Sequence, residues 1–410
     1  MTNSLLIKAP QKLNAVDVFL PSSKSISNRL LILNALSYSP YPIKNLSESD
    51  DTNAMFKVLN SNTNNFDVGA AGTSMRFLTA YLSKIMGEWT ITGSERMKQR
   101  PIKILVDALN NLGGKIDYLE KEGYPPLKIS GSALTGGELE LAGDVSSQYI
   151  SALLMIAPEM ENGLTLRLKG KITSAPYIQL TLKLMEQFGV KSKWNNDTII
   201  IPPSVYKPTS TKVEADWSAA SYWFEIMALS SGDSAICLKG LNKYSFQGDA
   251  VVAKLFNQLG VQSKFTSQGL QLTKTKSKVK NFKYDFTNEP DLAQTFAVTC
   301  AFLDIPFHLT GLHTLTIKET DRISALVHEL SKFGFNIKTN GSDNIFWEGD
   351  KTTPQSDIKI DTYKDHRMCM AFAPAVLKTQ QLTINDYMVV TKSYPKFWED
   401  LEKAGIVIME

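Results

Sequence analysis

The sequence predicts an α/β protein built from two similar domains, each containing three structural repeats. The chain has 410 residues, the length of two ordinary domains, and 43% of them are hydrophobic, enough for two cores. One helix–glycine–strand pattern recurs five times, at a spacing that leaves room for six repeats. Several expected helices also begin in small polar and basic residues, which are typical of α/β folds that bind anions.

The recurring pattern is an amphipathic helical segment, a glycine and a short alternating strand. It occurs in residues 108–118, 184–194, 255–265, 328–338 and 400–408. The glycines lie 71 to 76 residues apart, at Gly113, Gly189, Gly260, Gly334 and Gly405. One such connection occurs in any α/β protein, but five at near-constant spacing indicate repetition. A glycine there adopts the left-handed conformation that ends a helix and turns the chain into a strand. A degenerate copy at residues 55–66 gives the sixth repeat.

Seven expected helices begin in short polar segments. These are residues 21–29, 69–76, 146–148, 173–177, 289–291, 318–322 and 365–367. Their Ser, Thr and Asp residues are common N-caps, so capping alone explains each one. Capping does not explain Lys24, Arg29, Arg76, Arg322 and Arg367, because a cation at a helix N-terminus opposes the helix dipole. A bound anion reverses this effect, which predicts a site for small, highly anionic ligands.

Two acids lie among these basic residues. Asp291 follows Pro290, and Glu319 lies between Lys318 and Arg322. A carboxylate in a basic pocket can act as a general base or acid. An ordinary ion pair explains the same pattern, so both interpretations stay open from the residues alone.

Composition and spacing make several other functions unlikely. The net charge is only +3, from 44 Lys and Arg against 41 Asp and Glu, so we expect no nucleic-acid partner. The longest apolar run, Met368–Leu377, is too short to cross a bilayer, and we expect a cytoplasmic protein with no membrane partner. Cys237, Cys300 and Cys369 lie far apart, and the four histidines form no ligand pair, so we expect no disulfide framework and no metal.

Nine segments, in order along the chain, resemble the 5-enolpyruvylshikimate-3-phosphate synthase family. They are PSSKSISNR, GAAGTSMR, ERMKQRPI, GGELELAGDVSSQYISALLM, TSAPYI, EPD, IKETDR, KDHRM and the Lys392–Pro395 segment. Together they run from about Leu20 to about Trp398.

The resemblance implies two domains, each an inside-out α/β barrel of three βαβαββ units with helices inside and sheets outside. Domain 1 is then discontinuous and comprises residues 1–21 and 215–410, while domain 2 comprises residues 22–214. It also implies that the active site lies in the cleft between the domains.

The implied reaction transfers the enolpyruvyl group of phosphoenolpyruvate to the 5-hydroxyl of shikimate 3-phosphate and releases phosphate. The partners are these two small-molecule substrates, no cofactor is needed, and we expect a monomer. The two substrates together carry two phosphates and two carboxylates, which accounts for the basic residues at the helix starts.

The resemblance also assigns roles to individual residues. The implied catalytic residues are Lys24, Asp291 and Glu319. Asp291 takes the proton of the attacking hydroxyl, and Glu319 and Lys24 handle protons at the methylene carbon and the leaving phosphate. Shikimate 3-phosphate binding is assigned to Lys24, Ser25, Arg29, Ser146, Ser147, Gln148, Ser174, Tyr177, Asp291 and Lys318. Phosphoenolpyruvate binding is assigned to Lys24, Gly72, Arg100, Gln148, Arg322, Arg367 and Lys392.

The chain departs from the common pattern of the family at four positions. Ser22, Ala70, Phe77 and Thr314 stand where Gly, Asn, Pro and Asn are frequent. We expect activity to survive these changes. Because Ala70 and Phe77 border the implied phosphoenolpyruvate pocket, we expect altered sensitivity to glyphosate, which competes with phosphoenolpyruvate in the family.

Two alternative functions remain to be weighed. The first is UDP-N-acetylglucosamine enolpyruvyl transferase, which shares the fold but usually carries a catalytic cysteine on a mobile loop. The corresponding residues 95–101 contain no cysteine, and the three cysteines present lack basic neighbours that would activate them. The second is a non-catalytic repeat protein that binds anions or nucleic acid, but it does not account for carboxylates placed among the cations.

Overall fold

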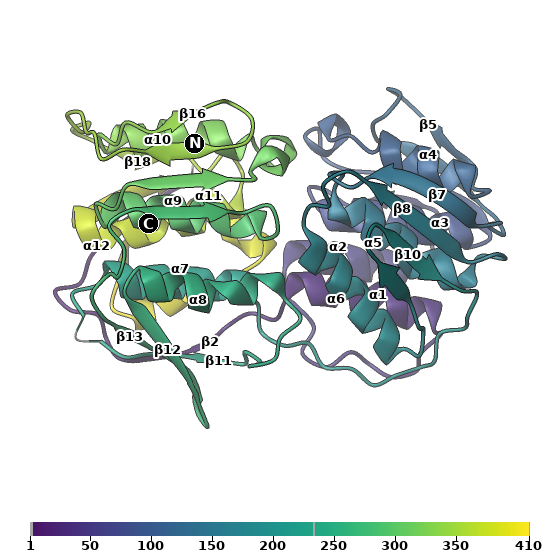
Figure 1. Ribbon diagram of the computed structural model, residues 1–410, viewed down its shortest axis with the longest axis horizontal. Coiled ribbons are helices and arrows are strands. Elements are labelled where there is room, and N and C mark those ends of the chain that lie inside the picture. The colour runs from purple at the N-terminus through teal and green to yellow at the C-terminus, as the bar shows by residue number, and fades with distance from the viewer. Residues whose placement is uncertain (1–2, 233, 410) are drawn as a thin grey trace. The chain divides into compact units, whose positions relative to one another are not determined.

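The computed structural model describes residues 3–232 and 234–409, and the chain divides into two compact units (Figure 1). Unit 1 comprises Met1–Ser22 and Glu214–Glu410, and unit 2 comprises Ser23–Val213. The chain therefore leaves unit 1 after its first two strands, completes unit 2 and then returns.

Unit 1 contains three four-stranded sheets and the helices that connect their strands. The first sheet, β12-β13-β11-β2, has strands β2 (Val16–Phe19), β11 (Ile236–Lys239), β12 (Val261–Thr266) and β13 (Gly269–Lys274). The second, β14-β15-β17-β16, has β14 (Phe282–Asp285), β15 (Phe307–Thr310), β16 (Lys338–Thr339) and β17 (Ile345–Trp347). The third, β18-β19-β1-β20, has β1 (Ser4–Lys8), β18 (Lys359–Ile360), β19 (Gln381–Asn385) and β20 (Val407–Met409).

The α-helices of unit 1 are α7 (Trp217–Leu229), α8 (Val252–Gln258), α9 (Ala293–Phe302), α10 (Arg322–Lys332), α11 (His366–Phe372), α12 (Val376–Thr379) and α13 (Phe397–Lys403). Short 3₁₀ helices are η3 (Gly248–Val251), η4 (Pro290–Leu292), η5 (His313–Ile317), η6 (Ala373–Ala375) and η7 (Tyr387–Lys392). Helix α9 is buried at nine of its ten residues, and α7 is buried at all but Ser218. A helix that is buried on all sides belongs inside a core, so α7 and α9 lie in the interior of unit 1.

Unit 2 contains two sheets of the same size. The strands are β3 (Asn65–Asp67), β4 (Gly87–Thr92), β5 (Ile116–Tyr118), β6 (Leu127–Gly131), β7 (Gly137–Ala142), β8 (Leu164–Lys169), β9 (Lys193–Asn195) and β10 (Thr198–Ile201), in the orders β3-β4-β6-β5 and β7-β8-β10-β9. The helices are α1 (Lys24–Leu36), α2 (Asp50–Leu59), α3 (Gly72–Lys84), α4 (Lys103–Asn111), α5 (Ser147–Ile156) and α6 (Ala175–Gln187), with η1 (Met97–Gln99) and η2 (Ala157–Glu159).

All five sheets share one topology. The first two strands of each repeat are parallel and joined through a helix, and the last two are antiparallel, as in β7 with β8 and β10 with β9. This is the βαβαββ order that the resemblance implies. In the third sheet of unit 1 the N-terminal strand β1 provides the last strand and pairs with both β19 and β20. The sheets are separate four-stranded sheets and do not close into a barrel.

The sixth repeat keeps its helices but has almost no sheet. Helices α1 and α2 pack together, and in the described residues of this repeat the pairing is a single parallel bridge between Lys44 and Lys212. Its segment after the second helix is the degenerate copy without glycine, and it leads into β3, which belongs to the sheet of the next repeat.

The five repeat glycines adopt the conformation that the sequence predicts. Each follows a helix and has a positive φ, between 85° and 99°, in the order Gly113, Gly189, Gly260, Gly334 and Gly405. At Gly334 an added Cβ would also lie 2.3 Å from the carbonyl oxygen of Thr352. Any other residue there is both strained and blocked, so the repeat pattern records a backbone requirement.

Within the described residues, no helix combines the length and the apolar character needed to span a membrane. The same residues contain no cluster of three or more His, Cys, Asp or Glu side chains suited to a metal ion. The three cysteines are free and buried.

Candidate functional site

The predicted site residues of unit 1 come together at the starts of its helices. Asp291 lies in η4, Arg322 is the first residue of α10, and Arg367 is the second residue of α11. Lys318 and Glu319 follow η5, and Lys392 ends η7. We call these six residues the acidic–basic cluster.

Asp291 is the centre of the acidic–basic cluster. Arg322 Nη1 donates to its Oδ1 and Arg367 Nη2 to its Oδ2, both at 2.9 Å, and Lys318 Nζ lies 3.8 Å from Oδ1. Burial alone would raise the pKa of Asp291, but the charges of Arg367, Lys318 and Arg322 hold that pKa well below its usual value. Without substrate, Asp291 is therefore an ionised and weak base.

Arg322 is held rigidly by carboxylates. It is 1% exposed, and Asp365 accepts from its Nε at 2.7 Å and from its Nη2 at 3.2 Å. Glu319 accepts from the same Nη2 at 3.1 Å and lies 3.7 Å from Lys392 Nζ. Burial lowers the pKa of Arg322, but these carboxylates more than reverse the effect, so the guanidinium stays charged. The ion pairing that the sequence left open is thus real, and it fixes the acids and bases in one place.

Asp365 contacts the candidate site, although the sequence analysis does not single it out. It lies in the KDHRM segment, is fully buried, caps α11 through the backbone nitrogen of Arg367 (2.9 Å) and positions Arg322. The sequence predicts the side chain of Asp365 as an N-cap alone. Nothing in the local sequence indicates that the same carboxylate reaches a helix 43 residues away.

The predicted site residues of unit 2 also gather at helix starts. Arg29, on α1, is 3% exposed, and its Nε and Nη2 donate to Thr181 Oγ1 (2.7 Å) and Ser151 Oγ (3.1 Å). The carbonyls of Ser25 and Tyr177 accept from the same guanidinium at 2.9 and 3.3 Å. Among the described residues no carboxylate pairs with Arg29, and burial lowers its pKa to about 10.

Phe77 adds an aromatic contact to Arg29. The guanidinium carbon lies 5.3 Å from the centre of the Phe77 ring, which is 1% exposed. A buried guanidinium with neutral partners is costly, and an aromatic face reduces that cost. The departure from the family pattern at Phe77 is therefore a structural part of this site.

Arg100 lies directly against the start of α3. An added Cβ on Gly72 would lie 2.5 Å from Arg100 Nη1, so only glycine allows this close approach. Arg100 Nε is buried and has no hydrogen-bond partner among the described residues. Arg76, which the sequence grouped with the anion-binding cations, donates to the carbonyls of Gly72 (3.2 Å) and Pro101 (3.0 Å). It holds the segment that carries Arg100.

The remaining predicted residues occupy helix starts in the same unit. Lys24 begins α1, and its Nζ lies 3.4 Å from Asp51 Oδ2. Ser146 caps α5, where Ser147 is the first residue and Gln148 Nε2 donates to Thr73 Oγ1 at 3.2 Å. Ser174 precedes α6, which contains Tyr177, and makes no capping bond. Its φ of 53° is left-handed, and such strain in a residue other than glycine is typical of binding sites.

Capping and anion binding therefore coexist at these helices. The side chains of Ser23, Ser146, Asp321 and Asp365 cap their helices as the simpler interpretation predicts. Arg29 and Arg100 are different because neither forms an ion pair in the described part of unit 2. Arg29 and Arg100 are thus buried guanidiniums without a carboxylate partner in the described part of unit 2, whereas Arg322 and Arg367 of unit 1 pair with carboxylates.

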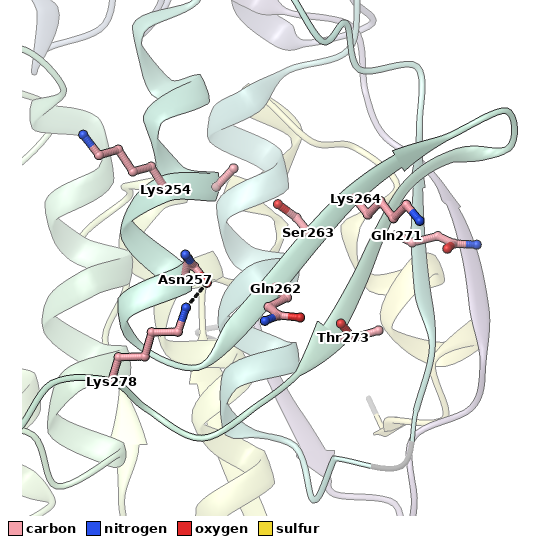
Figure 2. Close-up of a pocket in the computed structure, with 9 residues that line it drawn as sticks. Lys254, Asn257, Gln262, Ser263, Lys264, Gln271, Thr273 and Lys278 are labelled. Atoms are coloured by element: carbon pink, nitrogen blue, oxygen red, sulfur yellow. Dashed lines mark hydrogen bonds between the residues drawn. The ribbon is translucent and has the colours of Figure 1, made fainter.

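A separate polar recess of about 690 Å³ lies on unit 1 between α8, β12 and β13 (Figure 2). Three of its lining residues are lysines, and Lys278 Nζ donates to Asn257 Oδ1 at 2.8 Å. None of the predicted site residues lines it, and its lining contains no carboxylate that could act as an acid or base. The recess therefore offers no chemistry that would add to the candidate site.

Comparison with known proteins gives one consistent result. A family model described as EPSP synthase (3-phosphoshikimate 1-carboxyvinyltransferase) matches residues 7–63 and 59–401. A 3-phosphoshikimate 1-carboxyvinyltransferase of Bacteroides fragilis is 51% identical over 404 residues, covering 98% of both chains. The enzyme of that name from Shewanella pealeana is 35% identical over 441 residues, covering 98% of this chain and all of the relative.

Solved structures with low sequence identity share the fold. EPSP synthase from Acinetobacter baumannii superposes with a TM-score of 0.78 at 20% identity, and the match covers 100% of both chains. The enolpyruvyl transferase NikO from Streptomyces tendae gives a TM-score of 0.74 at 14% identity and covers 100% of this chain and 99% of its own. The two-domain α/β architecture predicted from the sequence is therefore confirmed.

Proposed function

Because this chain belongs to the EPSP synthase family, we propose that its two groups of helix starts bind the two anionic substrates of that family's reaction. The reaction transfers the enolpyruvyl group of phosphoenolpyruvate to the 5-hydroxyl of shikimate 3-phosphate and releases phosphate, in the shikimate pathway to aromatic amino acids. The chain is a transferase of this kind, and family membership decides against the two alternatives that the sequence raised.

The acidic–basic cluster carries the proton chemistry in this proposal. Asp291 accepts the proton of the 5-hydroxyl of shikimate 3-phosphate. At the same time the oxygen of that hydroxyl forms a bond to the central carbon of phosphoenolpyruvate. Glu319 or Lys24 gives a proton to the methylene carbon and takes it back when the carbon–oxygen bond to phosphate breaks, and the proton held by Asp291 leaves with the phosphate. Asp291 and Glu319 share Arg322, so both carboxylates are held in place before substrate arrives.

Phosphoenolpyruvate is assigned to Gly72, Arg100, Gln148, Arg322, Arg367 and Lys392, with Lys24. The support in unit 1 is that Arg322 and Arg367 hold Asp291 in place of a substrate anion. A substrate phosphate or carboxylate that draws these guanidiniums away leaves Asp291 a stronger base. Binding then activates the base only when substrate is present.

Shikimate 3-phosphate is assigned to Ser25, Arg29, Ser146, Ser147, Ser174 and Tyr177, with Lys24, Gln148, Asp291 and Lys318. The observation that carries this assignment is Arg29, a buried guanidinium whose protein partners are hydroxyls, carbonyls and an aromatic ring. A buried charge of this kind is stabilised by an anionic ligand. Hydroxyls at the starts of α5 and α6 add donors suited to a phosphate.

We also propose that the protein acts as a cytoplasmic monomer without a cofactor. Three free, buried cysteines suit a reducing compartment. The side chains of the two groups supply acids, bases and anion-binding cations, which are the groups the reaction needs. Sedimentation velocity of the purified protein tests the oligomeric state.

The direct test of this proposal is a coupled assay of phosphate release. Release should require both phosphoenolpyruvate and shikimate 3-phosphate, because the carbon–oxygen bond to phosphate breaks only after addition of the 5-hydroxyl. Equal release with phosphoenolpyruvate alone would indicate a phosphatase and overturn the assignment.

The role of Asp291 has its own prediction. The Asp291→Asn variant keeps the shape of the side chain but cannot accept a proton, so turnover should fall by about 10²- to 10⁴-fold. The matched control is Asp67→Asn, an exposed aspartate of unit 2 in β3 that caps a turn, which should leave turnover near the wild-type value. Normal turnover of Asp291→Asn would remove Asp291 from the role of base.

A further inference from the structure

Asp249 is a buried carboxylate beside the acidic–basic cluster that none of the assigned roles uses. It lies in η3 and is 3% exposed, and the hydroxyl of Ser218 donates to its Oδ2. Ser218 lies in the first turn of α7, which packs against both η3 and η4. Since η4 carries Asp291, the first turn of α7 places Asp249 in the same region of unit 1.

Four charged groups, carried by or next to α7, η4 and α11, face Asp249. Asp216 caps α7, Asp291 lies in η4, Arg367 lies in α11, and Glu289 precedes η4; each interacts electrostatically with Asp249. Arg367 is the cation of this set, and its Nη2 already donates to Asp291. An ionised Asp249 therefore adds negative charge next to a base whose own charge is more than balanced by Arg322, Arg367 and Lys318.

This environment brings the titration of Asp249 close to neutral pH. Burial, followed by the charge of Asp291, raises the pKa of Asp249 to about 6, while the Ser218 hydrogen bond favours the anion. Glu289 is coupled to it, because burial and the charge of Asp249 raise the pKa of Glu289 to about 7. The hydroxyl of Tyr284 donates to Glu289 Oε2 at 3.1 Å.

We propose that Asp249 is a positioning residue for the reaction, in which its carboxylate, held by Ser218, makes Asp291 a stronger base. The proposal rests on the assigned role of Asp291. The proton moves from the substrate hydroxyl to Asp291, and Asp249 exchanges no proton in that step. A neighbouring anion favours the protonated product state of Asp291 and opposes the two guanidiniums that weaken it. Activity then requires ionised Asp249 and declines as the pH falls through the pKa of Asp249.

The test compares pH profiles of kcat/KM for shikimate 3-phosphate at saturating phosphoenolpyruvate in wild type, Asp249→Asn, Asp249→Glu and Ser218→Ala. Asp249→Asn should lower the plateau value of kcat/KM about three- to tenfold. It should also lose the part of the decrease in kcat/KM at low pH that is due to protonation of Asp249. Asp249→Glu keeps a carboxylate, so its kcat/KM should still decrease as the pH falls. Ser218→Ala should move the decline to higher pH, because the anion loses its hydrogen bond. The phosphates of the substrates titrate alike in all four proteins, so differences between the profiles belong to the protein.

Two outcomes overturn the proposal. One is an unchanged profile shape in both Asp249→Asn and Ser218→Ala, even when rates fall equally at every pH, since that is a structural effect. The other outcome applies if Asp249→Asn does not fold. In that case a pH profile of Ser218→Ala that is not shifted relative to wild type overturns the proposal by itself. Asp291→Asn separates this inference from the proposed function. Normal turnover of that variant defeats the assignment of the base, whereas an inactive Asp291→Asn with unshifted Ser218→Ala defeats only the role of Asp249.

Discussion

Arg29 shows at the scale of one residue how a buried cation is prepared for a ligand. Its guanidinium is bound by two hydroxyls and two carbonyls and lies on the face of Phe77, with no matching carboxylate in the described residues. Each neutral partner fixes the orientation of the charge without neutralising it. If Arg29 has its proposed role, the cost of keeping this charge buried falls when shikimate 3-phosphate binds, and that difference contributes to the binding affinity.

The Phe77→Leu variant tests the aromatic contact. Leucine fills most of the volume but lacks the ring that faces the Arg29 guanidinium, an interaction worth about 0.5 to 2 kcal/mol. The KM for shikimate 3-phosphate should rise about 2- to 30-fold with a smaller change in kcat. Steady-state kinetics provides the measurement.

Phe188→Leu is the matched control for that variant. Phe188 is also fully buried in unit 2, but it packs edge-to-face on Tyr206 rather than on a guanidinium. It should lower the free energy of unfolding without raising KM. Equal KM values for Phe77→Leu and wild type would show that the ring contributes only packing.

Glu225 gives a second prediction, which concerns stability. It is fully buried in α7, and neither carboxyl oxygen has a hydrogen-bond partner in the described chain; Thr299 donates instead to the carbonyl of Thr295 at 2.7 Å. Burial raises the pKa of Glu225 well above its usual value, so the folded protein keeps the proton. As the pH rises above the ordinary glutamate pKa, the unfolded chain loses the proton first, and the free energy of unfolding falls with pH.

Glu225→Gln removes this titration and keeps the shape of the side chain. At low pH, where Glu225 is neutral in both states, the two proteins should have similar free energies of unfolding in urea. The variant should then gain stability relative to wild type as pH increases, at up to about 1.4 kcal/mol per pH unit, until the folded-state pKa is passed. A difference that does not depend on pH would show that Glu225 is ionised in the folded protein.

At the scale of elements, the helix starts were predictable and their partners were not. The seven polar segments do begin helices, or in the case of Glu289–Asp291 a 3₁₀ turn, because capping is a local property. The contact of Arg322 with Asp365, and that of Arg76 with Pro101, depend on how distant helices pack. No spacing in the sequence indicates these pairs, so Arg76 was grouped with ligand-binding cations while Asp365 was missed.

The start of α3 provides a prediction at this scale. Gly72 has ordinary helical backbone, so alanine fits the helix, but its Cβ would lie 2.5 Å from Arg100 Nη1. Arg100 is the flexible partner and must move, which displaces a guanidinium assigned to phosphoenolpyruvate. A lost charge-assisted hydrogen bond costs about 1.5 to 3 kcal/mol, so the KM for phosphoenolpyruvate should rise about 10- to 100-fold with little loss of stability.

A double variant checks that Gly72→Ala acts through Arg100. In an Arg100→Ala background the added methyl group meets no guanidinium, so it should produce no further increase in KM. If Gly72→Ala raises the KM by the same factor with and without Arg100, the effect of Gly72→Ala comes from the helix itself. Thermal unfolding of the three variants separates a folding defect from a binding defect.

At the scale of the whole molecule, periodicity made the fold predictable. The glycines at positions 113, 189, 260, 334 and 405 each need a positive φ, so they remain visible in the sequence even where the strands are only two or three residues long. The repeat without a glycine is also the one without a sheet of its own, and among its described residues Lys44 and Lys212 form an isolated bridge. The use of β1 as the last strand of a C-terminal sheet could not be predicted, because nothing local distinguishes it from a first strand.

Hydrogen exchange of the whole chain tests whether both units take part in binding. Shikimate 3-phosphate is assigned mainly to the starts of α1, α5 and α6, and phosphoenolpyruvate to the starts of α3, α10 and α11. Ligands that order helix starts slow the exchange of the free backbone amides there, because these amides lack partners within the helix.

We therefore expect shikimate 3-phosphate alone to protect the first turns of α1, α5 and α6, all of which lie in unit 2. Phosphoenolpyruvate added with it should extend protection to α10 and α11 in unit 1, since Arg322 and Arg367 belong to its binding set. The Arg29→Ala variant should lose the first effect, and the Arg367→Ala variant should lose the second. The partly buried helix α2 serves as an internal reference, because its N-cap Ser49 already accepts from the backbone nitrogen of Thr52 and no substrate is assigned to it. Protection confined to unit 2 with both substrates present would show that the acidic–basic cluster does not contact them, and would remove Asp291 and Glu319 from the chemistry.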